Sequence, residues 1–140
     1  MTADQNMATM QRMLEAINNR SFASVAPEVI AQGFARHDLA SLWVGVEEAS
    51  GVTDFLTMLI QAMPDFHLTI EKSFANDDHA ALVIRCTGTH TGEPLIDVPA
   101  TGKPVELVTI NLYRFEDGKI AESWQMPDAA GLMRQVGLLG

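Results

Sequence analysis

The chain has 140 residues, of which 47% are hydrophobic and 19% are charged, a composition typical of a folded protein and not of a disordered segment. Its formal net charge of −9 argues against binding to the phosphate backbone of nucleic acids, which requires clustered Lys and Arg. The length predicts one domain, residues 1–140, large enough to bury a hydrophobic core.

The cysteine content and the N-terminus indicate a cellular compartment. The single cysteine, Cys86, cannot form an intrachain disulfide, and we expect it to be a buried, inert thiol. Residues 1–13 lack the basic region and apolar run of a signal peptide, and no apolar run approaches the length of a membrane span. We therefore expect a soluble cytoplasmic protein that binds neither nucleic acid nor a membrane.

The first third of the chain predicts two helices. Residues 5–20 carry apolar side chains at helical spacing, and this face would form core or line a ligand cavity; its members are Met10, Met13, Leu14 and Ile17. A shorter helix follows over 22–31, with Pro27 in its first turn or at a break.

A short strand is predicted over 34–38, followed by a loop over 39–45. His37 and Asp38 are adjacent, so on a regular strand they face opposite sides, and both point inward only if a bulge intervenes. Trp43 lies in the loop, where it would cap the mouth of a pocket or fill the core.

A third helix is predicted over 52–63, capped by Ser50 or Thr53 and ended by Pro64. Its apolar face comprises Val52, Phe55, Leu59 and Met63.

Antiparallel strands follow this helix. Residues 66–74 alternate as a half-buried strand, and Asn76, Asp77 and Asp78 form a turn. Residues 80–90 have a nearly continuous apolar centre, which favours a central strand covered on both faces; Arg85 interrupts it and would need a partner if it faces inward. A connection over 91–104 contains three prolines, and connections of this length often carry function.

The last third of the chain predicts a hairpin and a final helix. The pair Asp117-Gly118 joins two strands that together span 105–125. One face of the first strand carries Thr109, Asn111 and Tyr113, and one face of the second carries Ser123 and Gln125, so these residues would form the floor of a pocket. Asp128 caps a helix over 129–136. Helices followed by antiparallel strands predict an α+β fold.

The residues favour acid–base chemistry over cofactor chemistry. The four histidines, His37, His67, His79 and His90, are scattered, and no HExxH motif, phosphate-binding glycine loop or GxSxG elbow occurs, so we expect no metal, nucleotide or flavin cofactor. A carboxylate such as Asp38 accepts protons better in an apolar pocket, although an Asp at a strand end also commonly caps a turn. Asn111 and Gln125 cannot exchange protons, but they can donate hydrogen bonds to a carbonyl or enolate oxygen.

Four segments resemble the SnoaL-like polyketide cyclases of the nuclear transport factor two-like superfamily. They are GTHTGE at 88–93, PATGKPVE at 99–106, YRFEDGKIAESW at 113–124 and PDAAGLMRQVG at 127–137. The resemblance implies one SnoaL-like domain: a cone-shaped α+β barrel whose curved mixed or antiparallel sheet is wrapped by N-terminal helices around a deep apolar pocket. It also implies a cofactor-free enzyme that acts on a small apolar molecule and forms a homodimer through the outer face of the sheet.

The resemblance assigns roles to individual positions. Gln125 matches the acid–base Asp of the family's aldol cyclases and Asn111 matches a His, so this chain lacks both titratable groups. In ketosteroid isomerases of the same superfamily, Asp38 matches the base and Asn111 matches the protonated Asp of the oxyanion hole, whereas Met13 replaces a Tyr donor. Epoxide hydrolases of the superfamily place an Arg between two inward carboxylates; Arg85 is present, but no carboxylate occupies the matching places.

Two hypotheses result. In the first, a cofactor-independent cyclase or isomerase acts on a polyketide- or terpenoid-like carbonyl compound, with Asp38, or His37 on a bulged strand, as base and with Asn111 and Gln125 at the oxygen. In the second, the protein binds a small molecule without catalysis, or is a hydroxylase-like or epoxide-hydrolase-like relative. The residues expected to contact the substrate are Phe34, Trp43, Met13, Met63, Tyr113 and Arg85.

Overall fold

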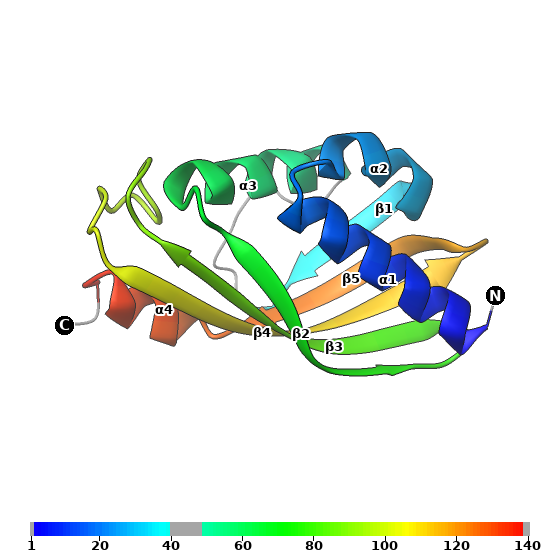
Figure 1. Ribbon diagram of the computed structural model, residues 1–140. Coiled ribbons are helices and arrows are strands. Elements are labelled where there is room, and N and C mark those ends of the chain that lie inside the picture. The colour runs from blue at the N-terminus through cyan, green and yellow to red at the C-terminus, as the bar shows by residue number, and fades with distance from the viewer. Residues whose placement is uncertain (1, 40–48, 139–140) are drawn as a thin grey trace.

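A curved five-stranded sheet, covered on its concave face by three helices, dominates the computed structural model, which describes residues 2–39 and 49–138 (Figure 1). The helices are α1 (Ala3–Asn18), α2 (Phe22–Val29), α3 (Ala49–Ala62) and α4 (Ala129–Gln135). The strands are β1 (Ile30–Asp38), β2 (His67–Ala75), β3 (His79–Thr89), β4 (Pro104–Glu116) and β5 (Lys119–Pro127).

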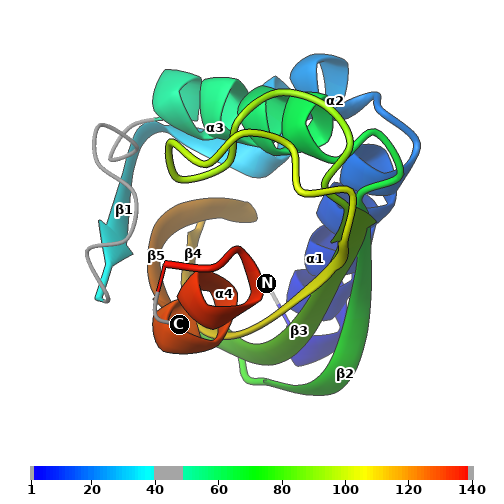
Figure 2. The same ribbon diagram turned by 90° about the vertical axis from the view of Figure 1, so that its left-hand side faces the viewer.

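The strand order is β1-β5-β4-β3-β2. Strand β1 pairs with β5 in parallel, and every other neighbouring pair is antiparallel, so the sheet is mixed and open, with β1 and β2 at its edges. Figure 2 shows the curved sheet with α2 and α3 over one side of it and α1 over another. These features confirm the predicted α+β class and the wrapping of the sheet by N-terminal helices.

Local sequence signals explain the ends of α1. Thr2 caps the helix through a capping box with Gln5, and Asn19 follows its last residue, with Arg20 in the left-handed region at φ 68°. The predicted apolar face is confirmed, because Met10, Met13, Leu14 and Ile17 are all buried. The helix ends two residues earlier than the sequence suggested.

Helix α2 also ends early. Pro27 lies inside it, and the chain turns directly into strand β1 at Ile30, which the sequence pattern had placed in the helix. The strand is therefore longer at its start than predicted. Trp43 and the rest of the predicted 39–45 loop after Leu39 lie outside the described residues. The side chain of Ser50, one of the two predicted caps of α3, also lies outside them.

The predicted hairpin between β4 and β5 is confirmed. Asp117 and Gly118 have φ values of 51° and 79°, and Glu116 pairs with Lys119 across them. Two consecutive positive φ values belong to the tight turn that matches the twist of antiparallel strands.

Strand β3 corrects one prediction. It is central in the sheet, but its burial alternates: Leu82 and Ile84 are buried under the helices, whereas Val83 and Arg85 on the convex face are half-buried. Within the described residues, α1, α2 and α3 all lie on the concave side (Figure 2). An apolar run on a strand therefore did not mean that both faces are covered.

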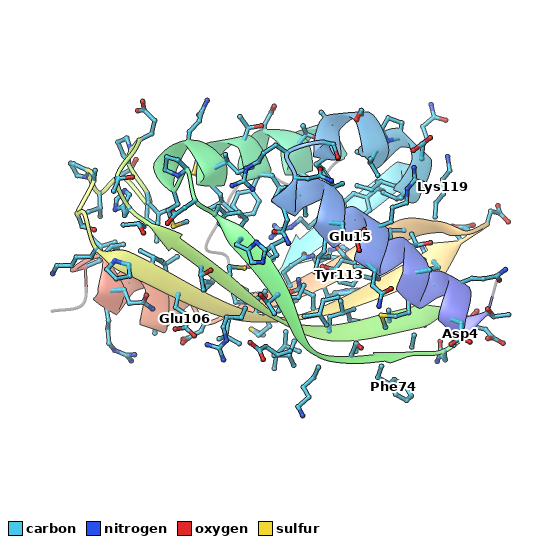
Figure 3. The ribbon with its side chains drawn as sticks, viewed as in Figure 1. Asp4, Glu15, Phe74, Glu106, Tyr113 and Lys119 are labelled. Carbon is cyan, nitrogen blue, oxygen red and sulfur yellow. The ribbon has the colours of Figure 1, made fainter. Side chains whose placement is uncertain are left out.

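The two faces of the sheet differ in their surroundings. Tyr113 lies between the sheet and the helices, whereas Phe74 projects away from the convex side and is 71% exposed (Figure 3). Within the described residues, none of the helices combines the length and hydrophobicity needed to cross a bilayer.

Candidate active site

A cavity of about 120 Å³ lies between the concave face of the sheet and the helices. Its walls are mostly apolar, with α1, α2 and α3 supplying side chains opposite the sheet. Among the lining residues are Met13, Phe22, Phe34, Phe55, Leu59, Cys86 and Tyr113. Phe34, Met13 and Tyr113 were expected in this lining.

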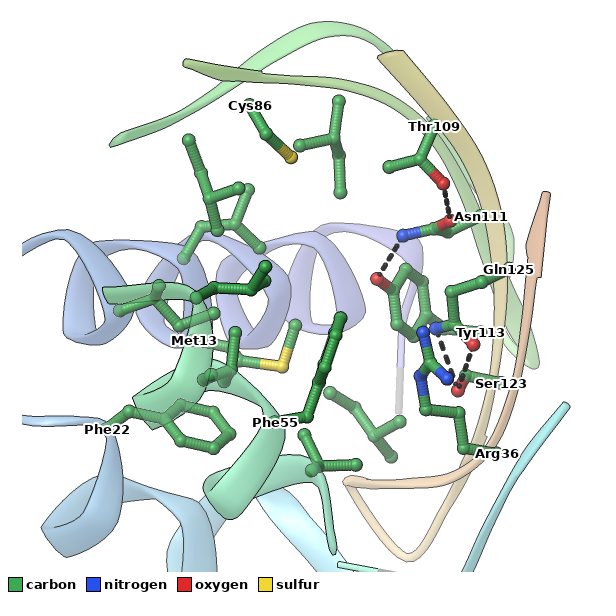
Figure 4. Close-up of a pocket in the computed structure, with 18 of the residues that line it drawn as sticks. Met13, Phe22, Arg36, Phe55, Cys86, Thr109, Asn111, Tyr113, Ser123 and Gln125 are labelled. Carbon is green, nitrogen blue, oxygen red and sulfur yellow. Dashed lines mark hydrogen bonds between the residues drawn. The ribbon is translucent and has the colours of Figure 1, made fainter. Parts of the chain in front are cut away.

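The cavity has a polar corner, built by alternation on two paired strands (Figure 4). On β4, Thr109 Oγ1 donates to Asn111 Oδ1 at 2.6 Å, and Asn111 Nδ2 donates to Tyr113 Oη at 2.9 Å. On β5, Gln125 Nε2 donates to Ser123 Oγ at 3.0 Å. All five side chains are buried, so the predicted polar floor exists and is hydrogen-bonded throughout.

Tyr113 ends the hydrogen-bonded chain on β4. Its oxygen accepts from Asn111, so its own O–H remains available to donate. Burial raises the pKa of Tyr113, while hydrogen bonds from Asn111 and Gln125 and the nearby charge of Arg36 act in the opposite direction. The phenol is therefore neutral at physiological pH and can act as a hydrogen-bond donor.

Arg36 on β1 also lines the cavity, although the sequence analysis did not identify it. The side chain is only 8% exposed, and its guanidinium carbon lies 5.2 Å from the centroid of the Phe55 ring. Phe34 and Arg36 are both buried and lie two residues apart on one strand. The strand period of two would have predicted this placement once Phe34 was assigned to the inside.

Asp38 lies at the edge of the polar corner. It shares a strand face with Phe34 and Arg36 and is half-buried. In the register of the sheet, Asp38 pairs with Gln125 and Arg36 pairs with Ser123. Asp38 is not one of the residues that line the cavity as it stands in this conformation.

His37 points the other way, which corrects the idea that it could act as the base. Its Nε2 lies 2.7 Å from Glu122 Oε2, and its ring stacks on Trp124 with 5.5 Å between centroids. The side chain is 43% exposed. The register of β1 shifts between Ile30 and Ala35, and from Ala35 to Asp38 the pairing is regular, so adjacent residues face opposite sides.

Two residues expected to contact the substrate, Arg85 and Met63, do not line this cavity. Arg85 lies on the convex face, where it pairs with Glu71 at 2.7 Å and with Glu106. Because Ile84 faces inward, its neighbour must face outward. Met63 follows the end of α3 and lines, with Leu132, a smaller cavity of about 10 Å³ that shares Leu59 and Cys86 with the larger one.

The family of the chain follows from its sequence. The family model for SnoaL-like polyketide cyclases matches residues 8–136. The chain belongs to the SnoaL-like polyketide cyclase family. No protein with a curated description matches it in sequence.

Several solved structures share the fold of this SnoaL-like chain. AclR from Streptomyces galilaeus, a proposed hydroxylase, has a TM-score of 0.86 at 22% identity, covering 99% of this chain and 100% of that one. IdmH from Streptomyces antibioticus, a proposed polyketide cyclase, has a TM-score of 0.81 at 24% identity, covering 95% and 99%. TsrD from Streptomyces laurentii has a TM-score of 0.85 at 20% identity, covering 99% and 98%. These similarities establish the fold.

A further ionisable group in the lining of this SnoaL-like cavity is a thiol. Burial raises the pKa of Cys86 to about 12, so the group is a neutral thiol near pH 7 and not a nucleophile. Across residues 2–39 and 49–138, no three His, Cys, Asp or Glu side chains gather as a metal site would require.

Proposed function

We propose that this SnoaL-like protein is a cofactor-independent enzyme that acts on an apolar, polyketide- or terpenoid-like carbonyl compound. The enzyme removes a proton from the carbon next to the carbonyl group. The observation that carries the proposal is the polar corner, in which a buried chain of hydrogen bonds ends at the Tyr113 hydroxyl inside an otherwise apolar cavity. A fixed donor in a water-poor site stabilises a developing oxyanion more strongly than water does.

The proposed step begins with the Asp38 carboxylate removing a proton from the α-carbon. The electrons of the C–H bond move into the bond to the carbonyl carbon, and the oxygen gains the charge of an enolate. Tyr113 donates a hydrogen bond to that oxygen, while Asn111 and Gln125 orient the phenol. In an isomerisation, the proton then returns from Asp38 to another carbon. In a cyclisation, the enolate carbon attacks a second carbonyl of the substrate, the C=O bond of that carbonyl opens, and its oxygen takes up the proton as the ring closes.

The sheet register supports separate roles for Asp38 as the base and Tyr113 as the hydrogen-bond donor. Asp38, Gln125 and Asn111 lie in one row across three strands, and Arg36, Ser123 and Tyr113 lie in the next row. Neighbouring rows on one face are about 7 Å apart, twice the rise per residue of a strand. This separation supports contact of the base and of the oxygen-binding donor with different atoms of one substrate.

The cavity volume limits the group that enters. Pockets for drug-sized ligands enclose about 300–1,000 Å³, whereas an apolar cavity of about 150 Å³ holds one benzene ring. The cavity here, about 120 Å³, is close to the smaller size. We therefore propose that a single ring of the substrate occupies it in this conformation.

Binding without catalysis is the second candidate. It is favoured by the amides at Asn111 and Gln125, which carry no titratable proton, and by the position of Asp38 at the edge of the lining. A ligand-binding protein needs the polar corner for orientation alone.

Exchange of α-protons for deuterium separates the two candidates without knowledge of the natural substrate. Cyclohexanone is incubated with the protein in D2O, and loss of the α-proton signal is followed by NMR. We expect the native protein to accelerate exchange and Asp38→Asn to abolish the acceleration. Asp54→Asn, at an exposed position of α3, is the matched control and should exchange like the native protein. Exchange that is unchanged in Asp38→Asn removes Asp38 from the mechanism.

We also propose that two copies of the chain pair through the convex face of the sheet. Exposed apolar side chains lie there on neighbouring strands, namely Phe74, Ile110, Leu112 and Met126. Ile110 is 58% exposed, and water-exposed apolar patches commonly mark an interface. Sedimentation of the native protein should give a dimer and Ile110→Lys a monomer, with Ala23→Lys at an exposed position of α2 as control. A native monomer would refute the pairing.

A further inference from the structure

Arg36 is a buried cation in the wall of an apolar cavity. With 8% of its surface exposed, it sits against the Phe55 ring at 5.2 Å, and Figure 4 shows its guanidinium turned toward Tyr113 and Gln125. Removing a charge from water costs several kcal/mol unless hydrogen bonds and opposite charge offset the loss. Arg36 makes a further contact within the protein, and its side chain still forms part of the cavity lining, where a ligand can meet the cation.

The neighbouring groups present donors to the same corner. Asn111 Oδ1 already accepts from Thr109, and Asn111 Nδ2 already donates to Tyr113. The phenol consequently directs its O–H, and not a bare acceptor, toward the cavity. Together with the guanidinium, the corner is rich in hydrogen-bond donors and contains a cation.

We propose that the natural substrate is an organic anion, in which a carboxylate or an ionised enol on an apolar ring places its negative oxygen against Arg36 and Tyr113. The inference rests on the proposed function, because it names the charge of the substrate that the same site would take. A guanidinium has five N–H donors in a planar fork, so it can keep a protein partner and still bind a ligand oxygen.

The location of Asp38 is compatible with an anionic ligand. Asp38 lies in the row of Gln125, whereas Arg36 lies in the adjacent row with Ser123 and Tyr113. The anionic end of the substrate therefore meets the cation, and its apolar ring extends toward Phe55 and Met13.

Binding of small probes to the whole protein tests the charge preference. Benzoate and nitrobenzene have nearly the same shape, but only benzoate is charged. Hydrogen bonds to charged groups are stronger than hydrogen bonds between neutral groups, so we expect benzoate to bind the native protein at least about tenfold more tightly than nitrobenzene. The enolate of cyclohexane-1,3-dione, compared with neutral cyclohexanone, is a second arm that distinguishes an ionised enol from a carboxylate.

Three variants assign the preference to Arg36. Arg36→Gln should lose it and Arg36→Lys should keep part of it, since the charge remains. Arg85→Gln on the convex face should leave it unchanged, because that side chain is not in the cavity lining. If Arg36→Gln does not fold, a shift of the Arg36 side-chain N–H signals in the native protein on addition of benzoate provides the same information.

The outcomes separate this inference from the proposed function. Equal affinities for the charged and neutral probes in both arms, or a preference that persists in Arg36→Gln, would overturn the anionic substrate even if Asp38→Asn abolishes deuterium exchange. A preference for either anion that disappears in Arg36→Gln supports it, even if the protein exchanges no α-protons. Asp38→Asn should retain the preference.

Discussion

Asn111 Nδ2 donates a hydrogen bond of 2.9 Å to Tyr113 Oη, and this contact determines the polarity of the whole cavity corner. The bond occupies an acceptor site on the phenol and leaves its proton for a ligand. An aspartate or histidine at position 111 would exchange protons itself, whereas the amide can only orient Tyr113. Two residues on one strand face thus convert a polar floor into a directed donor.

Tyr113→Phe is expected to remove most of the α-proton exchange while leaving the apolar walls of the cavity in place. Loss of one donor to an oxyanion typically lowers the rate by about 10²–10³-fold. The same change leaves Asn111 Nδ2 buried without its acceptor, which costs about 1–3 kcal/mol in unfolding free energy. Exchange rates and urea denaturation of the same preparation measure the two effects. An exchange rate equal to that of the native protein would exclude the phenol from catalysis.

The raised pKa of Cys86 leads us to expect a loss of stability at alkaline pH. Its pKa is about 12 in the folded protein against 9.0 for an ordinary thiol, so between these values the unfolded chain binds fewer protons than the folded one. Below pH 9 the thiol therefore costs no stability, and above pH 9 it lowers the free energy of unfolding by about 1.4 kcal/mol per pH unit. Urea midpoints at pH 8 and pH 10 should therefore differ less in Cys86→Ala than in the native protein. An equal pH dependence would mean that the thiol does not ionise on unfolding.

Gly92→Ala is expected to destabilise the contact between the 90–103 segment and α3. The Gly92 N–H donates to Ala62 O at 3.0 Å, and a Cβ at position 92 would lie 1.9 Å from Gln61 O. Overpacking of this kind typically costs about 1–3 kcal/mol. Gly33→Ala is the matched control, because nothing lies within 4 Å of a Cβ at that position. Similar melting temperatures for the two variants would contradict the close approach.

Asn6→Ala is expected to loosen the packing of α1 on the sheet. The buried side chain donates to Asn76 O at 3.0 Å and to Asp77 O at 2.9 Å, joining the helix to the turn between β2 and β3. Losing these bonds in a buried site should lower the unfolding free energy by about 1–3 kcal/mol. Gln11→Ala, on an exposed position of the same helix, should change it little. Chemical denaturation compares the two, and equal stabilities would show that the bridge contributes nothing.

The floor of the cavity could be predicted because a strand places alternate residues on one face. The spacing of Thr109, Asn111 and Tyr113 determined their common side. The Asp117-Gly118 turn pairs Glu116 with Lys119, but a register shift between Arg114 and Phe115, which the sequence did not reveal, brings Gln125 opposite Asn111. The same rule, applied from Phe34, leads to Arg36 and sends His37 outward. Arg85 was misplaced because a nearly continuous apolar run concealed the alternation of β3.

Other features depend on contacts between distant parts of the chain. The parallel pairing of β1 with β5 aligns Asp38 with Gln125, although 87 positions separate them in sequence, and no local signal specifies that register. Likewise, the sequence of α3 gave Met63 the spacing of its apolar face but could not tell which cavity that end of the helix reaches. The face of a helix or strand on which a residue lies could thus be predicted from the sequence, whereas its contacts with residues of other helices and strands could not.

A crystal structure of Asp38→Asn with a cyclic ketone bound at saturating concentration would show directly whether Tyr113 binds the carbonyl oxygen and position 38 faces the α-carbon. The variant removes turnover and keeps the shape of the side chain. We expect a carbonyl oxygen within about 3.2 Å of Tyr113 Oη, which is hydrogen-bond distance, and an α-carbon facing position 38. A carbonyl oxygen directed toward Cys86, at the apolar side of the cavity, would contradict this expectation.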